Sequence, residues 1–236
     1  MHVRLIDTGK ASADDNMRYD QQLLESLTSG SVPILHLYDW ASPSLTFGYF
    51  TQLAQHLDCK ALQKQGIAAA RRPTGGGIIF HLWDFAYSIV IPASHPGFSQ
   101  NTITNYRTVN GVIAEALAAC FGLKTCYAKP QQDSHPSDIV PFCMASHTIY
   151  DILLDGKKIG GAAQRKTKQG LLHQGTVFMT PPDYSLLQQL LLNKTIPQQM
   201  LELSTYALAG YNQTAALAKQ ELSAAIAAKL GAIASS

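Results

Sequence analysis

The sequence predicts a single α+β domain in which a mixed, mostly antiparallel sheet is flanked by helices. Three observations carry this prediction. Short apolar runs bounded by turn residues recur between residues 34 and 91. A strong hairpin signal, Asp155-Gly156, joins two further strands. Leucine and alanine recur at helical spacing in one segment in the middle of the chain and another near its end, so helices must cover the sheet.

The N-terminal third begins with a predicted helix. Asn16 is expected to cap it, Met17, Leu23 and Leu24 form its apolar stripe, and Ser29-Gly30 ends it. Strands are then predicted over residues 34–38, 45–50, 67–71, 78–81 and 86–91.

The rest of the chain alternates between the same two kinds of element. A helix is predicted from about Asn105 to Phe121, and Gly122 is its natural stop. Residues 129–141 are polar and have no periodicity, which is typical of a loop. Further strands are predicted over residues 150–154, 157–165 and 174–179, and residues 183 to about 230 are predicted to be helical.

Composition excludes several classes of partner. Only 14% of the 236 residues are charged and the formal net charge is +2, which does not indicate binding to nucleic acid or to an anionic membrane. The N-terminus lacks the apolar core of a signal peptide, and no apolar run is long enough to span a bilayer. The four cysteines show neither metal-ligand spacing nor a disulfide framework. We expect a cytoplasmic protein with no metal site, although an organelle matrix also fits.

The stretch from Arg71 to His81 is the most informative in the chain. Two arginines precede three consecutive glycines, and an apolar strand then ends in the histidine. The N–H groups of Gly75 to Gly77 can converge on an anion, and Arg72 can hold a carboxylate or phosphate. The spacing is that of neither a nucleotide P-loop nor a dinucleotide fingerprint. The alternative is a glycine-rich hairpin turn with solvated arginines.

A second constellation begins at Lys158, which is followed by the small residues Gly160 to Ala163. Small neighbours allow an ammonium group to reach into a narrow cleft, where it can hold a carbonyl oxygen, a phosphate oxygen or a thiolate. Lys157 should point the other way, because successive strand residues alternate between faces. The alternative for this pair is ordinary surface charge in a hairpin.

Cys143 is the third candidate, at the end of the irregular segment. A thiolate forms readily only beside a cation, and Lys158 follows after one strand and a hairpin, so a contact between the two is geometrically feasible. The alternative is a small buried hydrophobe.

These motifs resemble those of the lipoate–protein ligase and octanoyltransferase family, whose catalytic domain is shared with biotin ligases. Arg71-Arg72-Pro73-Thr74-Gly75-Gly76-Gly77 matches the family's Arg-Arg-x-Ser/Thr-Gly-Gly-Gly loop. Lys158-Ile159-x-Gly161-x-Ala163-Gln164 and His173-x-Gly175-Thr176 match its lysine and histidine–glycine motifs. The resemblance covers Asp7 to about Thr180 and implies a fold like that of class II aminoacyl-tRNA synthetases and biotin synthetase. We therefore expect one catalytic domain over residues 1–236, with a core over about 5–180 and a helical part over about 183–232.

The resemblance implies an enzyme that attaches an octanoyl or lipoyl group, in amide linkage, to one lysine of a lipoyl domain. The acceptors would be lipoyl domains of 2-oxoacid dehydrogenases or the glycine cleavage H protein, and an acyl carrier protein could be the donor. No permanently bound cofactor is expected. Lys158 and Cys143 are the implied catalytic residues. The implied acyl- or nucleotide-binding residues are Arg72, Thr74, Gly75, Gly76, Gly77, His81, Gly161, Ala163, His173 and Gly175.

Two mechanisms divide that family, and the sequence has features of both. In the transferases a cysteine carries the acyl group as a thioester, and in the ligases ATP, with Mg²⁺, and lipoate form lipoyl-adenylate. Cys143, Thr148, Tyr150 and Asp151 resemble the nucleophile segment of one cysteine-dependent transferase group, although Met144 stands where that group usually has Phe and Gly77 where it often has Arg. The intact triple glycine is more like the ligases, but the chain has no room for their usual C-terminal accessory domain, which could be a separate protein.

We favour the Cys143 thioester and keep the ATP-dependent ligase, acting with Lys158, as the alternative. A non-catalytic module that binds lipoyl domains, or one half of a two-chain ligase, is a further alternative. A biotin ligase is disfavoured because its Gly-Arg-Gly-Arg-type segment is absent. His81 is expected to be a hydrogen-bonded structural histidine rather than an acid or base, and both roles stay open for His173.

Overall fold

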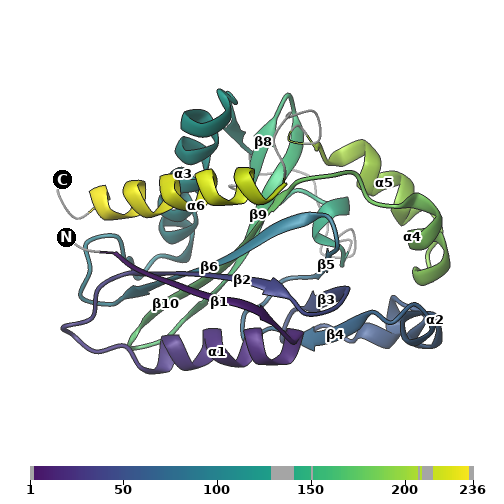
Figure 1. Cartoon of the computed structure of the whole chain (residues 1–236), viewed down its shortest axis with the longest axis horizontal. Coiled ribbons are helices and arrows are strands. Elements are labelled where there is room, and N and C mark those ends of the chain that lie inside the picture. Colours follow the sequence, from purple (N-terminus) through teal and green to yellow (C-terminus); the bar gives the residue numbers. More distant parts are fainter. Residues whose placement is uncertain (1–2, 129–140, 150, 207, 209–214, 234–236) are drawn as a thin grey trace.

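The strands form two sheets that together confirm the predicted α+β class. The structure, a computed structural model, describes residues 3–128, 141–149, 151–206, 208 and 215–233 (Figure 1). In spatial order, the large sheet consists of β1 (Arg4–Ala11), β2 (Ile34–Trp40), β6 (Asp84–Pro92), β10 (Gly170–Phe178), β9 (Lys157–Lys166), β8 (Ile152–Leu154) and β7 (Cys126–Tyr127). The small sheet consists of β4 (Ala68–Arg71), β3 (Ser44–Phe47) and β5 (Ile78–His81).

Both sheets are mixed, and most of their pairings are antiparallel. β1 runs parallel to β2 and β3 runs parallel to β4, whereas β2, β6, β10, β9, β8 and β7 pair antiparallel in turn. The hairpin between β8 and β9 turns at Asp155 and Gly156, with φ angles of 51° and 79°. Both residues are left-handed, as this dipeptide predicts.

Helices cover both faces of the large sheet (Figure 1). The helices are α1 (Ala13–Glu25), α2 (Cys59–Lys64), α3 (Thr102–Phe121), α4 (Tyr184–Leu190), α5 (Ile196–Leu203) and α6 (Ala215–Ala232). On β6, Ile89 and Ile91 pack with α3 and α6, while Val90 packs with the leucines of α1. This alternation follows from the two-residue period of a strand, and it explains why β6 is apolar on both sides. Within the described part of the chain, no helix is both long and apolar enough to cross a membrane.

Several predicted boundaries were wrong. Asn16 lies inside α1, which Ser12 caps instead by accepting a hydrogen bond from the Asp15 N–H, and the helix ends at Glu25. The Asn16 amide donates to the Asp39 carbonyl, so its buried position serves the packing of α1 on β2. The elements β1, β7 and α2 were not predicted. Most of the predicted loop, residues 129–140, and Tyr150, the first residue of a predicted strand, lie outside the described residues.

Candidate active site

A cavity of about 390 Å³, lined by residues from both sheets, is where most of the candidate residues meet. Its wall includes Arg72, Gly76, Gly77, His81, Cys143, Lys158, Gly161, Ala163 and Gly175. Thr74, Gly75 and His173 do not line this wall, although the first two belong to the same loop. Three motifs that lie far apart in the sequence therefore line one cavity.

The glycine loop is held in place through its carbonyl groups. The Arg72 guanidinium donates from Nη2 to the Gly75 and Gly77 oxygens, at 3.1 and 2.7 Å, and the Thr51 hydroxyl donates to the Gly76 oxygen at 3.0 Å. In a trans peptide the N–H points opposite to the preceding carbonyl, so the Gly76 and Gly77 N–H groups face away from these anchors. Among the described residues these two N–H groups have no acceptor. The loop is thus suited to receive an anionic oxygen.

Arg72 is the cation that faces the candidate nucleophile. Its side chain is buried, and Nη1 donates to the Thr46 hydroxyl at 2.8 Å. Burial lowers the pKa of Arg72, and the charge of Cys143 is the largest influence that raises it again. The sequence suggested Lys158 as the cation beside the Cys143 thiol; Lys158 is paired with Asp151, and Arg72 is the cation whose charge interacts with Cys143.

Lys158 is engaged by a carboxylate. Its Nζ lies 2.6 Å from Asp151 Oδ2, both side chains are at most 4% exposed, and Nζ also donates to the Ser146 carbonyl at 3.3 Å. The N–H and hydroxyl of Thr148 donate to the same Asp151 oxygen, at 2.7 and 2.9 Å. A charged ammonium is therefore stabilised inside the cavity wall, where it can donate a hydrogen bond to a carbonyl oxygen.

At Gly161 and Gly77, neighbouring atoms lie so close to the backbone that a side chain would collide with them. A Cβ on Gly161 would lie 2.6 Å from Lys158 Cε and 2.8 Å from Asp151 Oδ1, so the ion pair crosses directly over this residue. A Cβ on Gly77 would lie 2.3 Å from the carbonyl oxygen of Pro141, which itself accepts a hydrogen bond from the Ile78 N–H. The bare backbone at Gly77 therefore allows the segment that carries Cys143 to pack on the glycine loop.

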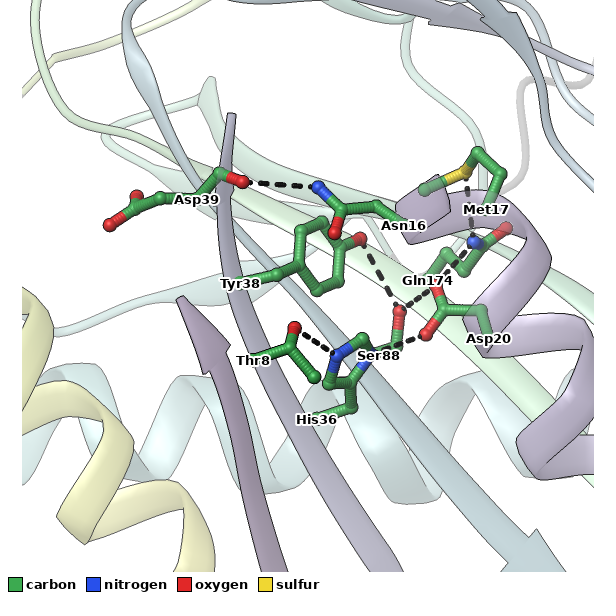
Figure 2. Close-up of polar contacts among 9 residues, drawn as sticks. All are labelled: Thr8, Asn16, Met17, Asp20, His36, Tyr38, Asp39, Ser88 and Gln174. Carbon is green, nitrogen blue, oxygen red and sulfur yellow. Dashed lines mark hydrogen bonds and ion pairs between the residues drawn. The ribbon is translucent and has the colours of Figure 1, made fainter. Parts of the chain in front are cut away.

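A buried polar network behind the cavity was not predicted (Figure 2). Asp20, on α1, is fully buried and accepts from Ser88 at 2.5 Å and from the Gln174 amide at 2.7 Å, while its other oxygen bonds His36 Nδ1 at 2.7 Å. Gln174 in turn accepts from the Thr74 hydroxyl at 2.7 Å, so the network extends to the glycine loop. The only sequence signal for it is a polar residue, such as His36 or Ser88, within an apolar strand.

The two histidines have different environments. His81 bonds Asp84 through Nδ1 and Thr46 through Nε2, each at 2.8 Å, and its ring stacks on Trp40. His173 is fully buried, and desolvation lowers its pKa to about 3. Its Nδ1 lies 2.8 Å from the side-chain amide nitrogen of Gln164 on the neighbouring strand β9. His173 therefore supports the sheet behind the site.

A thiol, a guanidinium and an ammonium thus share the wall of one cavity. Residues 12–226 match the family model of the lipoyl protein ligase A/B catalytic domain, and the chain belongs to this family. The fold and family that the sequence predicted are confirmed.

Individual relatives give the same picture. The octanoyltransferase LipM of Anoxybacillus flavithermus is 30% identical over 181 residues, and that of Kyrpidia tusciae is 32% identical over 180 residues. Both matches cover 75% of this chain and 65% of the relative, so the chain spans about two thirds of the length of these proteins. A lipoate-protein ligase A crystallised with ATP has a TM-score of 0.76 at 25% identity, covering 98% of this chain and 86% of that structure.

Proposed function

We propose that this chain transfers an octanoyl or lipoyl group to a lysine of a lipoyl domain through a thioester on Cys143. The observation that carries the proposal is that Cys143 and Arg72 line the same cavity and interact through their charges. A cation beside a thiol favours the thiolate, which is the nucleophile. The octanoyltransferases among the relatives support the same chemistry.

The reaction proceeds in two acyl exchanges. The Cys143 thiolate attacks the carbonyl carbon of an acyl thioester, the negative charge moves to the carbonyl oxygen, and the donor thiolate leaves and takes up a proton. The neutral amine of the acceptor lysine then attacks the enzyme thioester, loses a proton, and expels the Cys143 thiolate. Lys158 and the N–H groups of Gly76 and Gly77 would hold the oxyanion in both steps. Stabilisation of the oxyanion by such donors usually contributes most to catalysis.

A free carboxylate would need ATP, and one observation favours this second candidate function. The N–H groups of Gly76 and Gly77, with Lys158 on the wall of the same cavity, also suit the phosphate of an acyl-adenylate. The ATP-bound structure of a lipoate-protein ligase supports this reading for the fold. The acceptor lysine would then displace AMP, and Cys143 would have no covalent role.

Intact mass distinguishes the two mechanisms. The chain is mixed with an octanoyl thioester of acyl carrier protein, and then with a lipoyl domain or the glycine cleavage H protein. We expect one octanoyl group on the free enzyme, removable by hydroxylamine, and its passage to the acceptor. Cys143→Ser should abolish both steps, whereas Cys59→Ser, at an exposed cysteine, should change neither.

Two outcomes contradict the proposal. Full activity of Cys143→Ala with lipoate and ATP would assign the ligase mechanism. No mass gain on the acceptor, with either the thioester or lipoate plus ATP, would assign a module that binds lipoyl domains without modifying them.

A further inference from the structure

A continuous line of hydrogen bonds connects a buried carboxylate to Arg72. Asp84 Oδ2 bonds His81 Nδ1 at 2.8 Å, His81 Nε2 bonds the Thr46 hydroxyl at 2.8 Å, and that hydroxyl bonds Arg72 Nη1 at 2.8 Å. All four side chains are buried. We call Asp84, His81, Thr46 and Arg72 the arginine relay.

The donors and acceptors of the relay have one consistent direction. A guanidinium only donates, so the Thr46 oxygen accepts from Arg72. The Thr46 hydroxyl proton is then free to go to His81 Nε2, which accepts it. The remaining ring proton is on His81 Nδ1 and goes to Asp84, which accepts. All three hydrogen bonds can form with a neutral imidazole, and stacking on Trp40 at a centroid distance of 4.1 Å holds the plane of the ring.

The relay completes the fixation of the guanidinium. Nη2 is held by the carbonyls of Gly75 and Gly77, and these two bonds alone leave the opposite corner of the planar group without an anchor. Thr46 supplies that anchor at Nη1 from β3, at the centre of the small sheet. Asp84 is itself held by the Thr176 hydroxyl from the large sheet. The plane of Arg72 is thus set by elements of both sheets.

The relay also keeps the balancing negative charge away from Arg72. A carboxylate in direct contact with the guanidinium would compete with the Cys143 thiolate for the same cation. Here two neutral groups, Thr46 and His81, separate Asp84 from Arg72. The carboxylate can orient the chain of hydrogen bonds without occupying the side of the guanidinium that the thiol contacts.

We propose that Thr46 and His81 are positioning residues that hold the Arg72 guanidinium against the Cys143 thiol and so determine the reactivity of that thiol. The inference rests on the proposed thioester function, since it concerns the same nucleophile. It assigns to His81 a role through Arg72 rather than contact with the acyl group or proton transfer.

The test measures the alkylation rate of Cys143 by iodoacetamide, without any donor or acceptor, by peptide mass spectrometry. Thr46→Val keeps the side-chain shape but removes the hydroxyl, and we expect Cys143 to react about tenfold more slowly or worse. Thr46→Ser keeps the hydroxyl and should restore most of the rate. The exposed Cys59 and Cys126 are references within the same molecule and should react at an unchanged rate.

A second variant guards against a local failure of folding. His81→Phe keeps a ring for stacking on Trp40 and removes both polar nitrogens, so it should slow Cys143 alkylation as Thr46→Val does. In acyl transfer, both variants should lower kcat and leave KM for the donor nearly unchanged. Circular dichroism and thermal melting establish that each variant is folded.

The outcomes separate this inference from the proposed function. Folded Thr46→Val and His81→Phe proteins with wild-type alkylation at Cys143 would overturn the relay, whether or not the enzyme forms an acyl thioester. A wild-type enzyme that forms no thioester, but whose Cys143 still loses reactivity in both variants, would overturn the thioester function and leave the relay standing.

Discussion

Gly161→Ala should disable the site by adding one methyl group beneath the Lys158–Asp151 ion pair. The new Cβ would lie 2.6 Å from Lys158 Cε, 2.8 Å from Asp151 Oδ1 and 2.9 Å from Lys158 Nζ. Ordinary contact begins near 3.4 Å, so the lysine stem must retreat by about 0.8 Å or the pair must separate. The strand backbone of β9 has hydrogen-bonded neighbours on both sides and cannot yield easily.

The expected loss follows from that displacement. A shift of about 1 Å in a positioned group costs about 100-fold in rate, which corresponds to about 2.7 kcal/mol of transition-state stabilisation. The free energy of unfolding should fall by only about 1–3 kcal/mol, as for other overpacked sites, because both ends of the pair can move together. The variant should therefore be folded, bind its donor, and be slow in the acyl-transfer step.

Single-turnover acyl transfer, followed by intact mass, measures the rate of the chemical step directly. Gly30→Ala is the matched control, since a Cβ there meets nothing within 4 Å, and it should behave as wild type. A folded Gly161→Ala enzyme with a rate within threefold of wild type would refute the assignment of Lys158, because its ammonium could not then be needed at its present position.

The remaining predictions concern the thiol segment and a buried histidine. Gly77→Ala should separate the Cys143 segment from the glycine loop, because its Cβ would meet the Pro141 backbone oxygen at 2.3 Å, and should slow thioester formation about tenfold or more. Gly30→Ala, with open space around its Cβ and outside the site, is the control, and equal rates for the two variants would contradict the expectation. Because the pKa of His173 is about 3 in the fold and about 6.5 in the unfolded chain, the unfolded state binds the extra proton, so stability is lost as pH falls below 6.5 towards 3. By pH 5 the free energy of unfolding, measured by chemical denaturation, should be about 2 kcal/mol lower than at neutral pH. His173→Gln should remove this part of the pH dependence. An unchanged pH dependence in the variant would show that other groups cause it.

Local signals in the sequence predicted which groups meet in the cavity but not how they pair. Two motifs indicate which backbone and side-chain groups can approach a ligand: three glycines after two arginines, and a lysine before small residues. Both motifs line the cavity. Which cation lies near Cys143 depends on how β5 packs against the segment around Pro141, and sequence spacing does not contain this information. The spacing therefore suggested Lys158, whereas the cation whose charge interacts with Cys143 is Arg72. Asp151 lies seven positions before Lys158, yet only the hairpin register and the bare Gly161 bring the two charges together.

The fold shows the same division between local and tertiary information. The hairpin at Asp155-Gly156 and the stop at Gly122, where φ is 65°, were predictable because each depends on one residue's conformational preference. The strand β1 was not, because most of its side chains are exposed and it lacks the alternation that marks a half-buried strand. Asn16 is a good cap by residue type, but its burial against Asp39 is a tertiary effect that propensity cannot register.

The two buried cations of the site differ in how their charge is balanced, and this difference indicates different roles in the proposed mechanism. Lys158 has a carboxylate 2.6 Å away, so its charge is already compensated, and in the proposed mechanism it would act chiefly as an oriented hydrogen-bond donor. Arg72 reaches its carboxylate only through two neutral groups, and its Nε has no hydrogen-bond partner among the described residues. A buried guanidinium so poorly compensated attracts an anion strongly. In the proposed mechanism, the Cys143 thiolate is the anion that Arg72 would attract before acylation, and after acylation the same cation would polarise the thioester carbonyl that the acceptor lysine attacks.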